Sequence, residues 1–142
     1  MKIALASDHA GFELKNELVA YVATLGYETE DLGTHSLESV NYPTYGKLVG
    51  EAVASGRFDL GILVCGTGIG IGIAANKVPG IRCATCSEPY SAMLSRQHND
   101  ANILALGARV VGDGMAKLMV KSWLEAEFEG ERHSLRINLL EN

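Results

Sequence analysis

The sequence predicts an α/β fold in which helices cover both faces of a five-stranded parallel sheet. Three observations lead to this prediction. Five short apolar runs alternate along the chain with longer segments of helical periodicity. The 142 residues are enough for one domain with a sizeable core. An apolar fraction of 47% with 16 glycines is typical of a globular α/β protein. We therefore expect one domain over residues 1–142, a three-layer, doubly wound sheet of Rossmann-like or flavodoxin-like order, and a C-terminal helical arm at about 129–142.

The first half of the chain supplies three of the predicted strands. Its elements are, in order, strand Lys2 to Ser7, helix Phe12 to Leu25, edge strand Tyr27 to Leu32, a helix from Asn41-Tyr42-Pro43 to about Ser55, and strand Leu60 to Val64. Gly26 marks the end of the first helix, and proline is tolerated in the first turn of the second.

The second half supplies the remaining two strands. Its elements are a helix that opens at Ile71-Gly72-Ile73-Ala74-Ala75, strand Ile81 to Thr85, helix Glu88 to Gln97, the short strand Ile103 to Leu106, and a helix over roughly Met115 to Phe128. Cys83 and Cys86 form a C-x-x-C, but they lie in and just after an apolar run. Without a second cysteine pair or a nearby histidine, we interpret them as core and strand-end residues.

Composition and charge exclude several classes of function. A net charge of −5 and a pI near 5.3 argue against a nucleic-acid partner. The chain has no signal peptide and no run of about 18 apolar residues, so we expect no membrane partner. Three cysteines cannot all pair, which fits a reducing compartment. The expected location is the cytoplasm.

The stretch Leu60 to Asn76 organises the chain, because it predicts a strand, a glycine-rich loop and a helix in direct succession. Glycine lets a ligand approach the backbone closely, and the N–H groups at a helix amino terminus favour an anion. A Walker loop would need a Gly-Lys pair, and a Cys-x5-Arg loop would need arginine in place of Ile71. The dinucleotide pattern fits only residues 70–75, which begin too late after the strand. We expect a local anion site of another kind.

Cys65 stands at the end of this strand, next to the predicted helix amino terminus. The helix dipole and the loop N–H groups stabilise a thiolate there, which makes Cys65 a candidate base or nucleophile. The alternative is a buried small apolar residue, the role of most free cysteines. Position alone leaves the two interpretations about even.

Other reactive side chains follow the carboxyl ends of the predicted strands, where ligands bind in such sheets. Asp8 and His9 follow the first strand and Arg109 follows the fifth, while we expect His98 and Asn99 in a loop that reaches the same edge. Asp8 alone would more commonly be a helix cap. A cysteine, two histidines and an arginine from separate parts of the chain favour a catalytic site.

The C-terminal arm carries Arg132 and Arg136, which share one face of a helix and repel each other unless an anion lies between them. A solvated surface is the simpler interpretation. However, Leu135, Leu139 and Leu140 are apolar residues in the same segment, and a partner subunit is a candidate for covering them.

Four separated motifs of this chain resemble the corresponding motifs of one protein family. They are Ser7-Asp8-His9-Ala10-Gly11, Cys65-Gly66-Thr67-Gly68-Ile69-Gly70, Ala74-Ala75-Asn76-Lys77 and His98-Asn99-Asp100-Ala101-Asn102. In these motifs the chain resembles the type B ribose 5-phosphate isomerases, a family that includes allose and galactose 6-phosphate isomerases. The likeness runs from Lys2 to Arg136. It implies an aldose–ketose isomerase of the pentose phosphate pathway that needs no metal or cofactor and forms a homodimer or a dimer of dimers with shared active sites.

The resemblance also implies a role for each matching residue. Cys65 would move the proton between C1 and C2 with help from Thr67, and His98 would open the furanose ring. The implied substrate-binding residues are Asp8, His9, Gly66, Thr67, Gly68, Ile69, Gly70, Asn99 and Arg109, with Tyr42 close by, and Arg132 and Arg136 would hold the phosphate, across the dimer interface. One branch of the family has a glutamate base where this chain has Ile71, and that branch lacks the cysteine.

The sequence leaves the sugar open. Ribose 5-phosphate is the first choice, and a six-carbon sugar phosphate, allose or galactose 6-phosphate, is the alternative. A non-catalytic regulator that binds sugar phosphates would keep the arginines and the glycine loop, but it would not need both Cys65 and His98.

Overall fold

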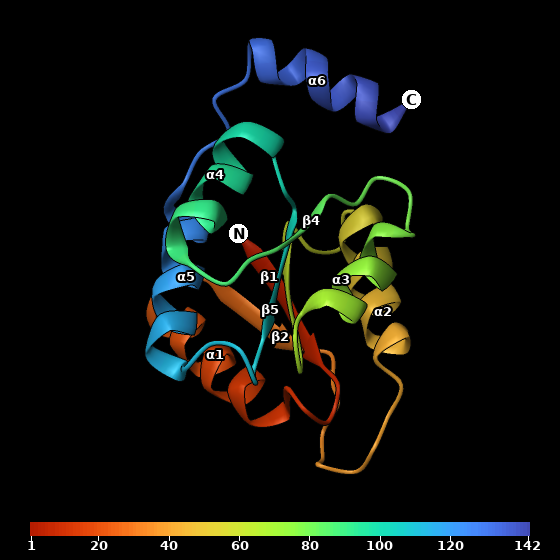
Figure 1. The fold of residues 1–142 in the computed structure, drawn as a ribbon, viewed down its shortest axis with the longest axis vertical. Coiled ribbons are helices and arrows are strands. Elements are labelled where there is room, and N and C mark those ends of the chain that lie inside the picture. Colours follow the sequence, from red (N-terminus) through yellow and green to blue (C-terminus); the bar gives the residue numbers. More distant parts are fainter.

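The computed structural model describes residues 1–142 and forms a parallel sheet between two layers of helices (Figure 1). The elements are β1 (Lys2–Ser7), α1 (Phe12–Thr24), β2 (Glu28–Asp31), α2 (Tyr42–Ala54), β3 (Leu60–Cys65), α3 (Ile69–Asn76), β4 (Cys83–Thr85), α4 (Pro89–Asn99), β5 (Ile103–Gly107), α5 (Asp113–Glu125) and α6 (Arg132–Glu141). The predicted doubly wound, five-stranded parallel sheet is confirmed, and so is the predicted edge position of β2. None of the helices combines the length and apolarity that a membrane crossing needs.

The strand order is β2-β1-β3-β5-β4, so β5 lies inside the sheet and β4 forms an edge. The burial of the two strands agrees with these places. All five residues of β5 are buried, whereas the three residues of β4 are half-buried or exposed. β5 pairs with β3 from Gly61 opposite Ile103 to Cys65 opposite Gly107.

Side chains that alternate along the strands belong to two separate hydrophobic cores, one on each face of the sheet. On one face, Ile62 and Val64 pack with apolar residues of α1, α4 and α5, and Trp123 is the largest buried side chain there. On the other face, Leu63 and Cys65 pack with residues of α2 and α3. Cys65 therefore belongs to the side of the sheet that α3 covers.

The edge strand β2 is joined to α1 by a buried ion pair. Lys15 of α1 is fully buried, and its Nζ donates to both carboxylate oxygens of Asp31, at 2.8 and 2.7 Å. The same Nζ donates to the Thr34 carbonyl at 2.8 Å. Burial of an ammonium group is costly without such partners, so this pair holds the end of β2 and the loop after it in place.

Most element boundaries differ from the sequence prediction by one to three residues, and α5 (Asp113–Glu125) begins and ends earlier than the predicted Met115 to Phe128. The third helix begins at Ile69 rather than Ile71, which shortens the glycine loop, and β4 begins at Cys83 rather than Ile81. The fourth helix extends past Gln97 to Asn99 and ends where Asp100 adopts φ 46°. Arg96 stabilises this ending, because its guanidinium donates to the Asp100 carboxylate at 2.9 Å and to the Ala101 carbonyl at 2.8 Å.

Candidate active site

The loop after β3 is shaped around the sulfur of Cys65. The backbone N–H of Gly68 donates to Cys65 Sγ at 3.1 Å, and the Cys65 side chain is buried. Gly68 has φ 81°, and a Cβ at this position would lie 2.8 Å from the Leu106 carbonyl carbon. Only glycine fits both constraints. The Gly68 N–H is thus a donor aimed at the Cys65 sulfur, at the position where the sequence predicts a candidate base.

The first turn of α3 presents further N–H groups. In this turn, the N–H groups of Gly70 and Ile71 donate to no acceptor in the chain, as is usual for the first residues of a helix. The ring of Tyr42 covers Gly70 closely, since a Cβ on Gly70 would lie 2.6 Å from it. Together with the positive end of the helix dipole, these groups form a site for negative charge beside Cys65.

Thr67 lies at the tip of the loop and is exposed. Its Oγ1 accepts the Ile69 N–H at 3.2 Å, so the hydroxyl proton remains free to point outward. Thr85 secures the loop from β4, because its hydroxyl donates to the Gly68 carbonyl at 3.2 Å. The loop is thus held by its neighbours while the Thr67 hydroxyl faces solvent.

Asp8 and His9 join this site from the end of β1. The Asp8 N–H donates to the Val64 carbonyl at 3.2 Å, which places Asp8 next to the end of β3. Its carboxylate accepts the Gly11 N–H at 3.1 Å, so it also stabilises the turn into α1. His9 Nδ1 accepts the Val40 N–H at 3.1 Å. A neutral His9 ring therefore carries its proton on Nε2 and can donate from that atom.

Arg109 joins the same edge from the end of β5. Its N–H donates to the Gly66 carbonyl at 3.0 Å, and a Cβ on Gly66 would lie 3.2 Å from an Arg109 guanidinium nitrogen. The arginine therefore lies over the loop with its side chain exposed. The structure brings together Asp8, His9, Tyr42, the loop from Cys65 to Gly70, and Arg109.

His98 and Asn99 do not belong to this cluster, and the prediction that they lie in a loop at the same edge is wrong. Both residues form the last turn of α4, and the Asn99 carbonyl accepts the Arg82 Nε–H at 3.0 Å just before β4 begins. A helix that follows a parallel strand runs back, so its last turn lies at the amino edge of the sheet. Figure 1 shows this end of α4 next to α6, away from the loop between β3 and α3.

The two edges are too far apart to share one substrate. In the register of the sheet, Ile103 of β5 lies opposite Gly61 of β3, and Gly107 lies opposite Cys65. Cys65 is thus four residues along the strand from the level of Ile103, a distance of about 13 Å. His98 comes before Ile103 and lies farther still from Cys65. Within one chain, His98 and Cys65 therefore cannot act on neighbouring atoms of the same sugar.

The arginines of the arm lie at the amino edge with His98. The predicted helical arm is confirmed as α6, in which Arg132 and Arg136 are exposed. Only His133 and Ile137 of this helix are buried, whereas Leu135, Leu139 and Leu140 are 66, 72 and 69% exposed. Arg82 holds the end of the arm, because it pairs with Glu141 at 2.6 Å.

Glu129 and His133 were not among the predicted site residues, yet both contact His98. The rings of His98 and His133 stack with centroids 4.4 Å apart, and Glu129 Oε1 lies 3.8 Å from His98 Nε2 and 3.5 Å from His133 Nε2. Burial, followed by the positive charge of Arg132, lowers the pKa of His133. The four-residue spacing of Glu129 and His133 was the only signal of their contact in the sequence.

The other two cysteines remain ordinary thiols. Burial, with a smaller contribution from Cys86, raises the pKa of Cys83 to about 12. Burial and the charge of Glu88 raise the pKa of Cys86 to about 11. Neither group forms a thiolate at neutral pH, in agreement with their interpretation as structural residues.

A cavity of about 550 Å³ lies away from Cys65, between the connection from α3 to β4 and the last turn of α6, with Asn99 in its wall. The Cys65 site is instead an open edge of the sheet, where Tyr42 and Arg109 are exposed. The hydrogen bond from Gly68 and the unpaired N–H groups of α3, not the size of a cavity, make the thiol the candidate reaction centre.

Fold and site together define an α/β protein with a glycine-rich loop, a buried cysteine and unpaired helix N–H groups at the carboxyl edge of its parallel sheet. The chain belongs to the Ribose/Galactose Isomerase family, whose model matches residues 3–140. The resemblance seen in the sequence motifs is thereby confirmed.

Individual relatives match the chain over nearly its full length. It is 56% identical to ribose-5-phosphate isomerase B of Escherichia coli K12 over 139 residues, which cover 98% of this chain and 93% of that protein. The structure of Clostridium thermocellum ribose-5-phosphate isomerase B superposes with a TM-score of 0.98 at 56% identity, over 99% and 95% of the two chains. A Mycoplasma genitalium ribose-5-phosphate isomerase B with bound ribulose-5-phosphate has a TM-score of 0.95 at 39% identity, over 99% and 93%.

Proposed function

We propose that this chain interconverts D-ribose 5-phosphate and D-ribulose 5-phosphate through an enediolate, as a step of pentose phosphate metabolism. The observation that supports it most directly is the Cys65 sulfur held by the Gly68 N–H beside the free N–H groups of α3, in a member of a sugar isomerase family. The reaction needs a base next to donors that stabilise a developing oxyanion, and this edge of the sheet supplies both.

In the proposed mechanism, the Cys65 thiolate removes the proton from C2 of the open-chain aldose and returns it to C1. The negative charge that develops on the carbonyl oxygen is stabilised by the N–H groups of Gly70 and Ile71, which have no other acceptor. The exposed hydroxyl of Thr67 assists the proton transfer between the two oxygens. No metal or cofactor takes part.

The site is completed by a second copy of the chain. Cys65 and His98 lie at opposite edges of the sheet, so a dimer that places the amino edge of one chain against the carboxyl edge of its partner would unite them. The exposed leucines of α6 support this arrangement, because an arm with apolar residues on its outer face is stabilised by packing on a partner. A homodimer, or a dimer of dimers, then contains two shared sites in each pair.

The remaining residues bind and prepare the substrate. His98 transfers a proton to or from the furanose ring oxygen and so opens the ring. The phosphate lies between Arg132 and Arg136, whose mutual repulsion it relieves. Residues Asp8, His9, Tyr42, Asn99 and Arg109, with the backbone of Gly66, Gly68, Ile69 and Gly70, hold the sugar. Binding energy from the phosphate then positions the reacting carbons at Cys65.

There are two alternatives to the isomerisation of ribose 5-phosphate. Allose or galactose 6-phosphate would need the same chemistry with one more carbon between the reacting end and the phosphate, and the family includes isomerases for sugars other than ribose. A regulator without catalysis is disfavoured, because it has no use for a thiol aligned with an N–H donor. The proposed location is the cytoplasm, since all three cysteines are free.

The direct test is turnover of ribose 5-phosphate, allose 6-phosphate and galactose 6-phosphate by the purified protein. We expect the highest kcat/KM for ribose 5-phosphate. Replacement Cys65→Ala removes the base and keeps the anion site, so it should lower kcat by about 100-fold or more while calorimetry still detects substrate binding. Activity of Cys65→Ala within about tenfold of wild type would remove Cys65 from the proposed mechanism. Binding without turnover of any of the three sugars by the wild type would favour a regulator.

A further inference from the structure

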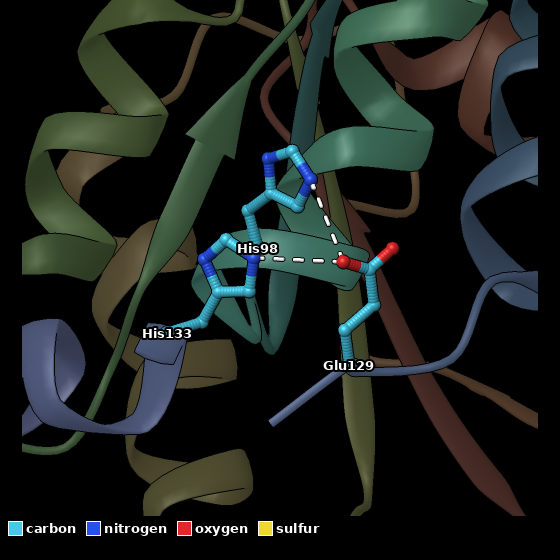
Figure 2. Close-up of side chains that lie close together, drawn as sticks. All are labelled: His98, Glu129 and His133. Carbon is cyan, nitrogen blue, oxygen red and sulfur yellow. Dashed lines mark ion pairs between the residues drawn. The ribbon is translucent and has the colours of Figure 1, made fainter. Parts of the chain in front are cut away.

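Three side chains from separate segments converge at the amino edge of the sheet. His98 comes from the last turn of α4, Glu129 from the segment before α6, and His133 from the first turns of α6. Figure 2 shows both imidazole rings turned toward one carboxylate oxygen of Glu129. The ligand atoms of all three residues lie within 4.8 Å of one another.

His133 Nε2 lacks a partner in this cluster. The His133 side chain is only 6% exposed, and its Nε2 is buried without a hydrogen bond. The 3.5 Å separation from Glu129 Oε1 is longer than the 2.7–3.2 Å of a normal hydrogen bond. A buried polar nitrogen without a partner is rare and costs stability. Glu129 Oε1 is the ion-pair partner of both this nitrogen and His98 Nε2.

We propose that His98, Glu129 and His133 form a binding site for a divalent transition-metal ion, with Zn²⁺ as the best fit. Two imidazole nitrogens and one carboxylate oxygen are the ligand set of open zinc sites, in which water or another group takes the fourth position. Imidazole nitrogen prefers zinc, copper, nickel or iron, whereas magnesium and calcium prefer oxygen ligands. The ligand set therefore selects against the common alkaline-earth ions.

The distances to Glu129 suit a zinc site, but the His98 ring must turn out of its stack with His133, because the two rings are only 13° from parallel. Ligands at about 2.1 Å in a tetrahedron around zinc lie about 3.4 Å apart. The observed separations of 3.5 and 3.8 Å from Glu129 Oε1 are close to this value. His98 and Glu129 are 37 and 45% exposed, so their side chains can move toward the ion, while the buried His133 stays in place. Arg132 and Arg136 repel a dication, so we expect micromolar rather than nanomolar binding.

An ion at this site would inhibit the enzyme. Zinc coordinates His98 through Nε2 and thereby fixes the ring that opens the sugar. This consequence rests on the proposed role of His98, whereas the metal site itself does not. Zinc would then act as a reversible inhibitor that a chelator removes, and not as a cofactor.

The test measures metal binding separately from activity. Protein freed of metal by a chelator is titrated with Zn²⁺ against a colorimetric competitor, and with Co²⁺ while its visible spectrum is recorded. We expect one ion per chain and a Co²⁺ spectrum of low coordination number. Glu129→Gln replaces the anionic ligand with a neutral amide, His133→Asn removes the imidazole Nε2, and each should weaken binding at least tenfold. The matched controls Cys65→Ser and Cys83→Ser should leave the affinity unchanged.

Two results would overturn the metal site. One is the absence of binding at micromolar Zn²⁺ by the wild type. The other is unchanged affinity in both Glu129→Gln and His133→Asn together with loss of binding in a cysteine variant, which would place the ion on a thiolate. Glu129 is half exposed, so its variant stays informative even if His133→Asn fails to fold. Binding that requires Glu129 and His133 but leaves turnover unchanged would support the site and contradict the proposed role of His98 instead.

Discussion

The division of the candidate site between two edges of the sheet makes a sharp prediction about mixed dimers. Cys65→Ala disables the carboxyl edge, and Arg136→Ala disables the amino edge. Arg136 is exposed and makes no ion pair in this chain, so its removal should not disturb the fold. Loss of a charge-assisted phosphate contact of about 1.5–3 kcal/mol lowers kcat/KM by about 10- to 100-fold. Each variant alone should therefore be nearly inactive at low substrate concentration.

Mixing the two variants should restore a defined fraction of activity. In a mixed dimer, one shared site carries both defects, while the other combines the intact Cys65 of one chain with the intact Arg136 of its partner. Random pairing of equal amounts gives about half mixed dimers, and each has one working site of two, so about a quarter of the wild-type activity should return. If each site were contained in one chain, every site in the mixed dimer would still carry one defect.

The assay is turnover of ribose 5-phosphate far below KM, after the two variants are unfolded together and refolded. Each variant refolded alone is the control, and native mass spectrometry measures the fraction of mixed dimers. Activity no higher than that of the better single variant, with mixed dimers present, would refute the shared site. The distance of about 13 Å between the two edges would then need another explanation.

Three further predictions address single side chains. His98→Asn should lower turnover of ribose 5-phosphate more than that of a four-carbon aldose phosphate, whose phosphorylated O4 cannot close a furanose ring; equal losses would assign His98 to another step. Lys15→Met leaves Asp31 without its buried partner and should lower the free energy of unfolding by about 3 kcal/mol in urea titrations. The matched control Lys2→Met removes a surface pair 4.0 Å long and should cost less than about 0.5 kcal/mol. A comparable cost for both would contradict the buried-pair argument.

The third prediction in this set concerns pH. The pKa of His133 is lower in the folded chain than in the unfolded chain. As the pH falls, His133 is therefore protonated more readily in the unfolded chain, and the free energy of unfolding should decrease below about pH 6.5. His133→Gln should remove part of this fall in thermal unfolding measured from pH 7 to pH 5, and an unchanged pH profile would contradict it.

The local parts of the fold and site could be predicted from the sequence. β1 has the predicted bounds, because an apolar run closed by a turn is defined by neighbouring residues alone. The Cys65 loop was predicted for the same reason, since a strand, a series of glycines and a helix follow one another directly. Gly68 needs its positive φ wherever the strand lies in the sheet.

The parts that depend on distant contacts could not be predicted. The position of β5 between β3 and β4 is set by packing of the whole sheet, although the fully apolar sequence of β5 agrees with an interior place. His98 was placed in a loop because the end of α4 depends on Arg96 and on the φ of Asp100. The contact of Glu129 with His98 depends on where α6 docks, which no local pattern specifies.

In the proposed dimer, the arm α6 would contribute both to the active site and to the contact between subunits. Only two of its residues, His133 and Ile137, are buried in the chain, and Arg82 holds its end through a surface ion pair. Such a helix is short for independent stability, so a partner that covers its exposed leucines would contribute much of its order. The same helix carries Arg132 and Arg136. If the proposed dimer separates, each Cys65 site would lose the arginines of its partner. Each arm would also lose the surface that stabilises it, so its own arginines would be less ordered.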